Sequence, residues 1–447
     1  MTGMPDDPSP PGRTGRLTTS PAGRLLRLGG VAGRVGLSLL VDRALASIGA
    51  RGDERRRETL LREATRVVEA LSRLKGAAMK VGQMLSLHEG LLPAEVTEVL
   101  RLLQRKAPPI PFEIVREEIE VQIPQHEEIF ASIEPEAFAA ASIGQVHRAV
   151  LRDGRRAAVK IQYPAIDRVV RADLDNLRLV LGGIVRMFAD VDFEPIWAEL
   201  RDRLLEELDY RREAANMRAF AERFTDDPRL VIPAVIDEAT TASILTMEFV
   251  DGRDPDAACA ATTPQELRDR WGQALFSFVL RGVLVDRLLH ADPNLSNFAF
   301  LDGGRVAVFD FGCVKSVPEP IARGYAELLL AVIEGRPRDI PGILDRFGVR
   351  YDHGGPIGLE LIEPYFRLFA AIVRETPAYR FGDDPDLYPR LLELGLQNAS
   401  EAASIRFPRD ILFVDRALAG TLGNLCRLRA AGPWRTLAAD LARQALD

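Results

Sequence analysis

The sequence has very few lysines: five in 447 residues, against fifty-three arginines. A GC-rich genome explains the many arginines but not the positions where lysine stayed. An ammonium is a compact point charge that suits phosphate oxygens, and a guanidinium is not a neutral replacement for it. Lys80 and Lys160 lie in recognisable motifs, whereas Lys75, Lys106 and Lys315 have no chemistry that we can assign. The two motif lysines are therefore informative.

Cysteines are scarce too. Cys259, Cys313 and Cys426 are widely spaced, odd in number, and fit no metal-binding spacing. This pattern argues against a disulfide framework and favours a reduced, cytoplasmic protein.

Long hydrophobic runs are also missing. No segment reaches the roughly 18–20 apolar residues that span a bilayer. The best candidate, Leu25–Ile48, is interrupted by three arginines and an aspartate, which also excludes a signal peptide. It is basic and amphipathic, so an interfacial membrane helix and an ordinary packing helix fit it equally well. We expect a cytoplasmic protein, peripheral on the inner membrane, without a transmembrane span.

The net charge of −7 is unevenly distributed. Residues 1–51 carry about +4, which leaves roughly −11 for the remainder. An acidic body argues against nucleic-acid binding.

Hydrophobic spacing predicts an α+β protein. Residues 1–22 read as a disordered tail and residues 23–111 as a helical extension. Residues 112–252 predict a small β-rich lobe with inserted helices, and residues 253–447 a mostly helical lobe that includes one hairpin. Asp153-Gly154 is a strong hairpin signal. The expected strands are Gln145–Leu151, Arg156–Gln162, Val231–Ile236, Ile244–Val250 and the hairpin Phe298–Leu301 with Arg305–Phe309. The expected helices include Phe112–Val121 and Leu174–Asp226.

The strongest chemical signal lies in the second half of the chain. His290-Ala291-Asp292-Pro293-Asn294-Leu295-Ser296-Asn297 precedes Asp310-Phe311-Gly312, which follows a buried-looking strand. With Lys160 at the end of Ala157-Ala158-Val159-Lys160, this is the order and chemistry of a protein-kinase-like nucleotide site. The sequence thus predicts a two-lobed, kinase-like fold with the nucleotide between the lobes.

Each polar residue of these motifs has an expected role. Asp310 and Asn297 can hold Mg²⁺ on the phosphates of ATP. Asp292 can orient or deprotonate the attacking hydroxyl or water. His290 fits a structural role that ties the loop to the core. The alternative is a set of polar residues that only cap loops.

Lys160 requires a carboxylate that directs its ammonium toward the phosphates. A helix expected over Arg201–Phe220 offers Glu206, Glu207, Asp209 and Glu213. Asp209 and Glu213 are spaced i,i+4 and share a face, and Glu213 is the better candidate. The alternative is a solvated acidic face balanced by Arg211 and Arg212.

Two further segments are expected to bind the nucleotide. Where kinases carry a glycine-rich flap, this chain has Ala139, Ala140, Ala141 and Ser142 in a loop. Alanine does not readily reach the positive φ values open to glycine, so this loop should be stiffer. The backbone of Glu248, Phe249 and Val250 is the expected hinge that hydrogen-bonds adenine.

With Lys80-Val81-Gly82-Gln83 upstream, the sequence resembles the UbiB family of atypical protein-kinase-like proteins, also called aarF-domain proteins. The resemblance runs from about Leu71 to at least Val317. It rests on the motifs above, on Glu207-Leu208-Asp209, and on two further signatures, Ser142–His147 and Lys160–Pro164.

The resemblance implies that a helix carrying Lys80 and Gln83 folds across the active-site cleft and meets Glu207 and Asp209. Lys80 and Gln83 are spaced i,i+3, which lets them share a face. Such a lid would block a protein substrate, and no Ala-Pro-Glu docking segment follows Asp310-Phe311-Gly312. Some bacterial members end in hydrophobic spans, whereas this chain ends in the charged, amphipathic Trp434–Asp447.

The resemblance also implies a function. The family is tied to the biosynthesis of ubiquinone and related isoprenoid quinones, and its members act as lipid-linked ATPases or unorthodox kinases. ATP (or ADP) and Mg²⁺ are the implied cofactors. A membrane lipid or quinone-precursor lipid and quinone-biosynthesis proteins are the implied partners.

Two other functions stay open. A small-molecule phosphotransferase of the aminoglycoside or choline kinase type shares the His-x-Asp and Asn arrangement, but the Lys80–Gln83 motif and the alanine-rich segment speak against it. A non-catalytic, nucleotide-gated lipid-binding scaffold could retain every motif named above.

Overall fold

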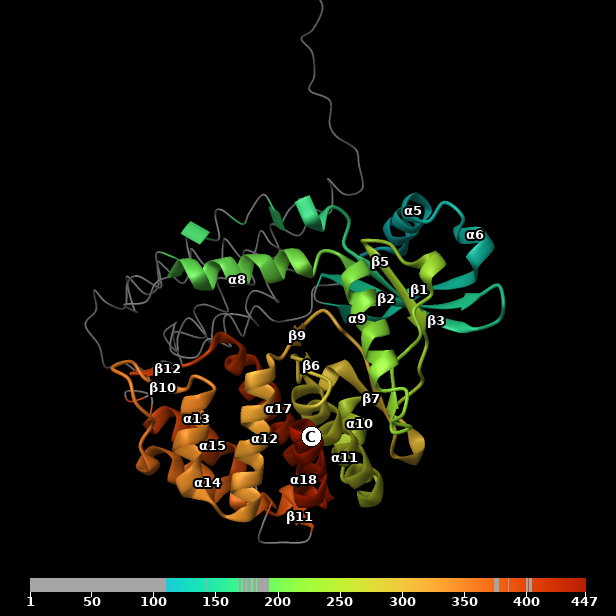
Figure 1. Cartoon of the computed structure of the whole chain (residues 1–447). Coiled ribbons are helices and arrows are strands. Elements are labelled where there is room, and N and C mark those ends of the chain that lie inside the picture. Colours follow the sequence, from blue (N-terminus) through green and yellow to red (C-terminus); the bar gives the residue numbers. More distant parts are fainter. Residues whose placement is uncertain are drawn as a thin grey trace, which may run out of the picture. The chain divides into compact units, whose positions relative to one another are not determined.

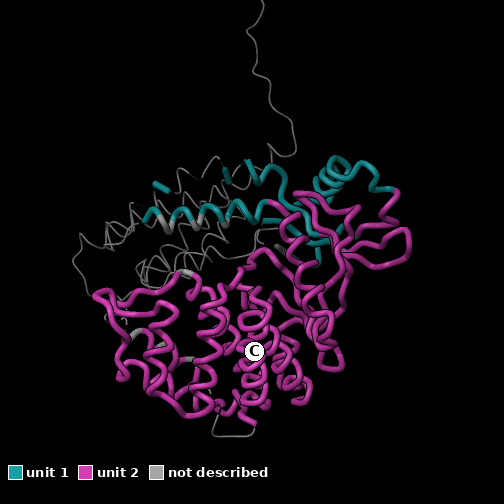
Figure 2. Tube along the Cα trace, viewed as in Figure 1, with its two compact units in different colours: residues 1–127, 134–147, 160–208 teal, residues 128–133, 148–159, 209–447 magenta. Residues whose placement is uncertain are grey.

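The computed structural model describes residues 110–141, 143–168, 170–171, 174, 178–179, 182, 193–373, 378–384, 386–398, 401 and 404–447. The chain forms two compact units (Figure 2). Unit 1 comprises residues 1–127, 134–147 and 160–208, and unit 2 comprises residues 128–133, 148–159 and 209–447. The predicted tail and nearly all of the predicted extension lie outside the described residues. The lobe boundaries expected from the sequence stay a prediction.

Four strands form the main sheet, in the order β1-β2-β3-β5. They are β1 (Phe130–Ala141), β2 (Gly144–Leu151), β3 (Arg156–Gln162) and β5 (Ile244–Glu248). The predicted Asp153-Gly154 hairpin is confirmed, since Gly154 has a φ of 88°, which glycine adopts without strain. Every residue of β3 after Arg156 is buried, as expected of a central strand.

Strand β1 was not predicted from the sequence. It contains a proline and several alanines, which are poor strand formers, and its alternation is weak. Ala139, Ala140 and Ala141 form its last residues. The expectation of a loop is therefore wrong for these three, and Ser142 lies outside the described residues.

The helices around the sheet differ from the prediction at one point. Helix α5 (Phe112–Gln122) confirms the expected Phe112–Val121 helix, and the short α6 (His126–Ile129) follows it. The continuous helix expected over Arg201–Phe220 is wrong: α8 (Phe193–Glu206) ends, and α9 (Tyr210–Arg223) begins after Asp209. Asp209 accepts a hydrogen bond from Arg211 N at 3.0 Å, and an aspartate in this position starts a new helix.

A second sheet, in unit 2, has the order β4-β8-β7. The hairpin of β7 (Phe298–Phe300) and β8 (Val306–Val308) is confirmed. The turn η3 (Asp302–Gly304) joins them. The strand expected over Val231–Ile236 is shorter: β4 covers Leu230–Val231, and only an isolated bridge joins Val235 to Met247. Pro233 lies between Val231 and Val235 and has no backbone N–H to donate to a neighbouring strand.

The rest of unit 2 is mainly helical. In Figure 1 the helices α11, α12, α17 and α18 lie side by side, and element contacts join α11 to the other three. Trp434 of α18 packs against Phe276 of α11, with ring centroids 5.2 Å apart, and is 1% exposed. The helices and 3₁₀ turns are α10 (Pro255–Cys259), α11 (Gln265–Leu284), α12 (Glu319–Glu334), α13 (Ile340–Arg346), α14 (Leu359–Val373), α15 (Leu387–Gln397), α17 (Arg409–Leu428), α18 (Trp434–Leu446), η1 (Asp237–Ala239), η2 (Leu295–Asn297), η4 (Pro337–Asp339) and η5 (Phe381–Asp383).

Three short strand pairs interrupt these helices, although the sequence predicted one hairpin only. They are β6 (Leu288–His290) with β9 (Val314–Ser316), β10 (Arg350–Tyr351) with β12 (Ile405–Arg406), and β11 (Tyr379–Arg380) with β13 (Ala431–Gly432). Pieces of two or three residues are too short to give a period in the sequence.

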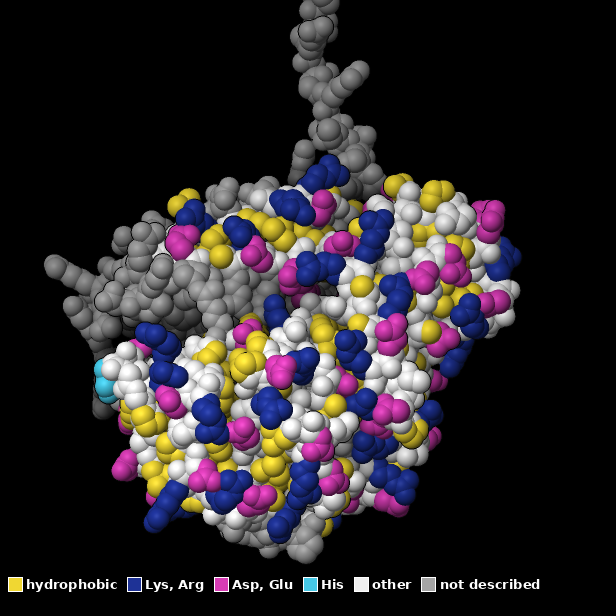
Figure 3. All heavy atoms as spheres, viewed as in Figure 1, with side chains coloured by type: hydrophobic (Ala, Val, Ile, Leu, Met, Phe, Trp, Pro, Cys, Tyr) yellow, Lys and Arg dark blue, Asp and Glu magenta, His cyan; other side chains and the backbone are white. Residues whose placement is uncertain are grey.

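The surface of unit 2 mixes charges of both signs. On the face drawn in Figure 3, basic and acidic side chains are interspersed over its helices. Exposed pairs such as Arg270–Glu266, at 2.6 Å, contribute at most about 1 kcal/mol each. Among the described residues, no helix has both the length and the apolar character needed to cross a bilayer.

Candidate active site

Two segments that carry the conspicuous motifs meet in unit 2. Strands β6 and β9 pair antiparallel, with His290 opposite Val314. Ala291 N donates to Cys313 O at 2.9 Å. The loop that begins at Asp292 therefore starts beside the end of Asp310-Phe311-Gly312.

The Asp292 loop is fixed by its own side chains. Asp292 Oδ1 accepts from Asn294 N at 3.3 Å. Asn294 Oδ1 in turn caps η2, accepting from Ser296 N at 3.1 Å and Ser296 Oγ at 2.9 Å. The Asp292 side chain is 16% exposed, so its carboxylate is held in place and still reaches the surface. Its contacts with Asn294 N and with Arg416 are both made through Oδ1.

Asn297 links the loop to β8. Its Nδ2 donates to Asp292 O at 3.4 Å, while its backbone carbonyl accepts from Phe309 N at 2.8 Å. Asp310 directly follows Phe309 in the chain. Because the amide nitrogen of Asn297 points at the loop, its amide oxygen faces away from that contact. The amide oxygen of Asn297 and the carboxylate of Asp310 are thereby carried by adjoining segments.

Asp310 has an unusual backbone. Its φ is 55°, in the left-handed region, which Asp tolerates better than most residues. Its Oδ1 accepts from Gly312 N at 3.3 Å, and its carbonyl accepts from His290 Nε2 at 3.0 Å. These bonds hold the aspartate in a fixed conformation.

His290 is confirmed as a structural residue. It is 3% exposed, and its ring lies 5.3 to 6.3 Å, centroid to centroid, from the rings of Phe220, Phe278, Phe298 and Phe311. Burial lowers the pKa of His290 below its ordinary value of 6.5. The imidazole is therefore neutral, with the Nε2 proton donated to Asp310 O.

Helix α9 holds the same segment from the other side. Asn216 Nδ2 donates to Phe311 O at 2.8 Å. The rings of Phe220 and Phe311 lie 5.1 Å apart, and Phe311 is fully buried. Glu213 is 5% exposed and lies one turn before Asn216 on this face of the helix. Glu213 is thus a buried carboxylate on the side of α9 from which Asn216 reaches Phe311 O.

One residue of this region was missed by the sequence reasoning. Arg416, on α17, lies with Nη2 3.5 Å from Asp292 Oδ1. It is separated from Asp292 by more than a hundred residues, in a region where no motif was recognised. Nothing in the local sequence distinguishes it from the other arginines.

The expected adenine hinge lies at the end of β5. Glu248 N donates to Ala234 O at 2.9 Å, and Phe249 N donates to Arg156 O at 3.0 Å. The Arg156 guanidinium stacks 4.9 Å above the Phe249 ring centroid. Val250 N has no hydrogen-bond partner among the described residues, so it can donate to a ligand.

Lys160 belongs to unit 1, as do Ala139 and Glu207. It lies on β3 and is 8% exposed. An ammonium is rarely buried to this degree without an opposite charge. Two residues along β3, Gln162 Nε2 donates to Leu208 O at 3.1 Å, which holds the segment between α8 and α9. The pairing of Lys160 with Glu213, in unit 2, stays a prediction.

The Ser142–His147 signature has a structural explanation. A Cβ on Gly144 would lie 2.1 Å from Ile161 O, so only glycine fits there. Gln145 Oε1 accepts from Ile110 N at 2.8 Å, which turns its Nε2 toward His147 Nε2, also at 2.8 Å. His147 Nδ1 donates to Glu134 O at 2.8 Å. His147 must therefore be neutral, with Nε2 as the acceptor.

This network predicts a loss of stability in mild acid. Burial lowers the pKa of His147 below 6.5. As the pH falls below about 6.5, the unfolded chain binds a proton at this position that the folded chain does not, so the free energy of unfolding decreases, by at most about 1.4 kcal/mol per pH unit. Chemical denaturation of wild type and His147→Gln between pH 5 and 8 measures this dependence of the free energy of unfolding on pH. The slope below pH 6.5 should be smaller in His147→Gln than in wild type. A variant with an undiminished slope would contradict the assignment, and His353→Gln, at an exposed histidine, is the control.

The expected lid cannot be placed in full. Lys80 and Gln83 lie outside the described residues. Of their expected partners, Asp209 caps α9, and the carbonyl of Glu207 lies 3.5 Å from Gln162 Nε2. The lid contacts of all four residues stay a prediction.

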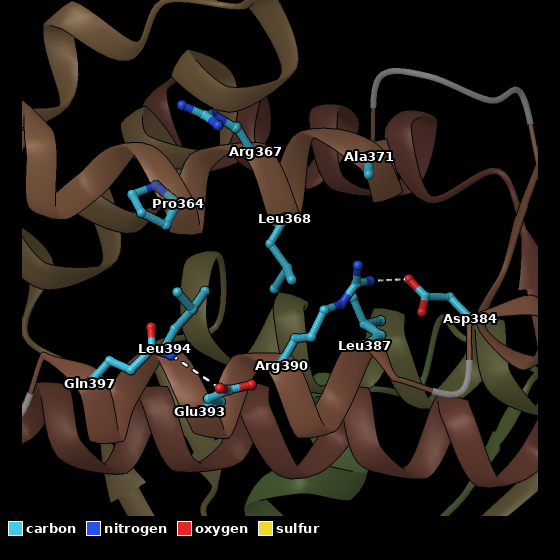
Figure 4. A pocket seen from close by; sticks show the side chains of 10 residues that line it. All are labelled: Pro364, Arg367, Leu368, Ala371, Asp384, Leu387, Arg390, Glu393, Leu394 and Gln397. Carbon is cyan, nitrogen blue, oxygen red and sulfur yellow. Dashed lines mark hydrogen bonds and ion pairs between the residues drawn. The ribbon is translucent and has the colours of Figure 1, made fainter.

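A cavity of about 340 Å³ lies between α14 and α15, away from these motifs in the sequence (Figure 4). Of its charged side chains, Arg390 pairs with Asp384 and Arg367 with Glu363, the latter at 2.8 Å, while Glu393 accepts from Gln397 Nε2 at 3.0 Å. None of the predicted site residues lines it.

In the described part of the chain, no three His, Cys, Asp or Glu side chains form a metal-binding group. A metal ion at Asp310 and Asn297 would therefore need ligands that the protein does not supply. Mg²⁺ on a nucleotide has such ligands in the phosphate oxygens and water.

The chain is similar to known proteins. A family model for the ABC1 atypical kinase-like domain matches residues 102–341. The mitochondrial atypical kinase COQ8B of Rattus norvegicus is 32% identical over 329 residues, which are 72% of this chain and 62% of the rat protein. The mitochondrial atypical kinase coq-8 of Caenorhabditis elegans is 34% identical over 289 residues, or 62% of this chain and 37% of that protein. The chain thus spans less than two thirds of these relatives.

A solved structure supports the fold. Rv3197 of Mycobacterium tuberculosis, determined in complex with erythromycin, is 29% identical and has a TM-score of 0.64, covering 87% of this chain and 98% of that one. The predicted α+β, kinase-like fold is confirmed, although the helical extension over the cleft lies outside the described residues. The resemblance inferred from the motifs is also confirmed. The chain belongs to the ABC1 atypical kinase-like family, the UbiB family.

Proposed function

We propose that the chain binds Mg²⁺-ATP and uses it for hydrolysis or phosphoryl transfer in support of isoprenoid-quinone biosynthesis or lipid homeostasis. The observation that carries this proposal is that Asp292, Asn297 and Asp310 lie on adjoining segments joined by hydrogen bonds. Asn297 binds Asp292 O and Phe309 N, while His290 binds Asp310 O and Asn216 of α9 binds Phe311 O. A loop-capping role alone does not require the backbone carbonyls of Asp310 and Phe311 both to be held by side chains from elsewhere in the fold.

The donor set fits Mg²⁺. A carboxylate and an amide oxygen are the hard ligands that this ion prefers, and phosphate oxygens and water complete its shell. Asp310 and Asn297 would hold it, and when bound it neutralises charge on the phosphates. Asp292, with its carboxylate oriented by Asn294 N and Arg416, would accept the proton of the attacking hydroxyl or water.

The remaining nucleotide contacts follow from the motifs. Lys160 would contact the phosphates, with Glu213 as its carboxylate partner, since both charges are buried. The last residues of β1, Ala139–Ala141, would cover the phosphates together with Ser142. Glu248 to Val250 would hydrogen-bond adenine. Lys80 and Gln83, with Glu207 and Asp209, would form a lid that excludes protein substrates.

The proposed partners come from the family. Similar proteins are named mitochondrial, as in rat, or chloroplastic, as in Arabidopsis thaliana. We infer that this chain works at the inner membrane as a peripheral protein, on a membrane lipid or a quinone-precursor lipid, with quinone-biosynthesis proteins beside it. A nucleotide-gated scaffold that binds without turnover is the second candidate, since every residue named above serves binding as well.

One experiment separates these functions. Mg²⁺-dependent ATP binding and hydrolysis are measured on the purified protein, with and without anionic liposomes and a quinone-precursor-like phenol. We expect hydrolysis that these additions increase. Binding without turnover under every condition would favour the scaffold, and rapid transfer to an amino-alcohol would favour a small-molecule phosphotransferase.

A further inference from the structure

Three residues of α17 face the Asp292 loop. Arg416, Gly420 and Asn424 are spaced i, i+4 and i+8, so they form one stripe along the helix. Arg416 contacts the Asp292 carboxylate, as described above. The other two contact Pro293, the next residue of the loop.

Gly420 allows the close approach of helix and loop. A Cβ at this position would lie 2.3 Å from Pro293 Cγ and 2.7 Å from Pro293 Cβ. The proline ring cannot move aside as a flexible side chain would. Glycine is unfavourable inside a helix, so a glycine whose place is needed for packing has a specific reason to be there.

Asn424 binds the backbone of the same residue. Its Nδ2 donates to Pro293 O at 2.7 Å, and the side chain is 8% exposed. A buried amide with one well-formed bond fixes the group that accepts it. Pro293 is thus held by its ring on Gly420 and by its carbonyl on Asn424.

Helix α17 is itself anchored. Its residues Ala417 and Leu425 are fully buried, and it packs along α11. Tyr325, on α12, donates to the Asp415 carboxylate, beside Arg416. The stripe therefore belongs to a helix that is fixed by two neighbours, in a part of the chain without a recognised motif.

We propose that α17 sets the position of Asp292: Gly420 and Asn424 are positioning residues that act through Pro293, and Arg416 holds the carboxylate. This role rests on the proposed function of Asp292. It assigns a task in catalysis to a helix that begins about a hundred residues after Asp310-Phe311-Gly312.

The test compares Gly420→Ala and Asn424→Ala with wild type in the full chain, measuring kcat for Mg²⁺-ATP hydrolysis, the Kd for ATP and the melting temperature. We expect kcat to fall about 10- to 100-fold in each, as misplacement of a reacting group by about 1 Å does, while Kd stays unchanged. Gly395→Ala is the matched control, because a Cβ there meets nothing within 4 Å. If Gly420 and Asn424 had a merely structural role, their replacement would lower the melting temperature, and kcat would not fall while Kd stays unchanged.

A double-mutant cycle with Asp292→Asn completes the test. If Asn424 acts through Asp292, Asn424→Ala has no further effect on kcat in that background. If Gly420→Ala and Asn424→Ala both keep the wild-type kcat while Asp292→Asn is inactive, the α17 inference is overturned and the proposed function of Asp292 stands. An active Asp292→Asn, or a wild type without turnover, overturns the proposed function of Asp292 and this inference with it.

Discussion

Replacing Asp292 with Asn is expected to reduce kcat for ATP hydrolysis or phosphoryl transfer by about 10²- to 10⁴-fold, the usual contribution of a general base. The amide has the shape of the carboxylate and can still accept from Asn294 N, so the loop keeps its conformation. It cannot take up a proton from the attacking group. Turnover and the Kd for ATP are measured side by side, and Kd should not change.

Asp302→Asn is the matched control for this variant. Asp302 is an exposed aspartate of the β7–β8 turn, paired with Arg253 at 2.9 Å, and it has no expected role in the reaction. It should leave kcat at the wild-type value. An Asp292→Asn protein with wild-type turnover would remove Asp292 from the mechanism.

Replacing Phe311 with Ala is expected to lower the free energy of unfolding by about 3–5 kcal/mol, as for other buried aromatic residues. Phe311 is fully buried, and its ring contacts those of Phe220 and His290 at 5.1 and 5.3 Å. The cavity would lie where α9 meets the loop that carries Asp310. Chemical denaturation at pH 7.5 measures the loss.

Phe407→Ala provides the comparison, because this phenylalanine is 39% exposed. Its replacement should change stability by much less, since less apolar surface is removed from contact. Equal losses in the two variants would mean that the ring of Phe311 does not fill a packed core.

Features set by neighbouring residues could be predicted from the sequence. The β2–β3 and β7–β8 hairpins follow from Asp153-Gly154 and Asp302-Gly303-Gly304, whose glycines at positive φ make the turns. The order of Lys160, Asp292, Asn297 and Asp310 along the chain similarly predicts a kinase-like fold. Both kinds of signal are carried by residue type and spacing alone.

Features set by contacts across the chain could not be predicted. The boundary between α8 and α9 depends on Asp209 acting as a cap rather than as an acid on a continuous helix. Strand β1 is specified by its neighbours in the sheet, since its alanines carry little strand preference. Arg416, Gly420 and Asn424 gain their meaning only when α17 meets the Asp292 loop.

We propose above all that Asp310 and Asn297 bind a Mg²⁺-nucleotide, with His290 and α9 holding the backbone of Asp310 and Phe311. Isothermal titration of wild type and Asp310→Asn with ATP, in Mg²⁺ and in EDTA, tests it most directly. We predict saturable binding by wild type that requires Mg²⁺, and at least about tenfold weaker binding by Asp310→Asn, since a lost contact to a charged group costs about 1.5–3 kcal/mol. Equal affinity in the two proteins, or binding that is indifferent to Mg²⁺, would contradict the account.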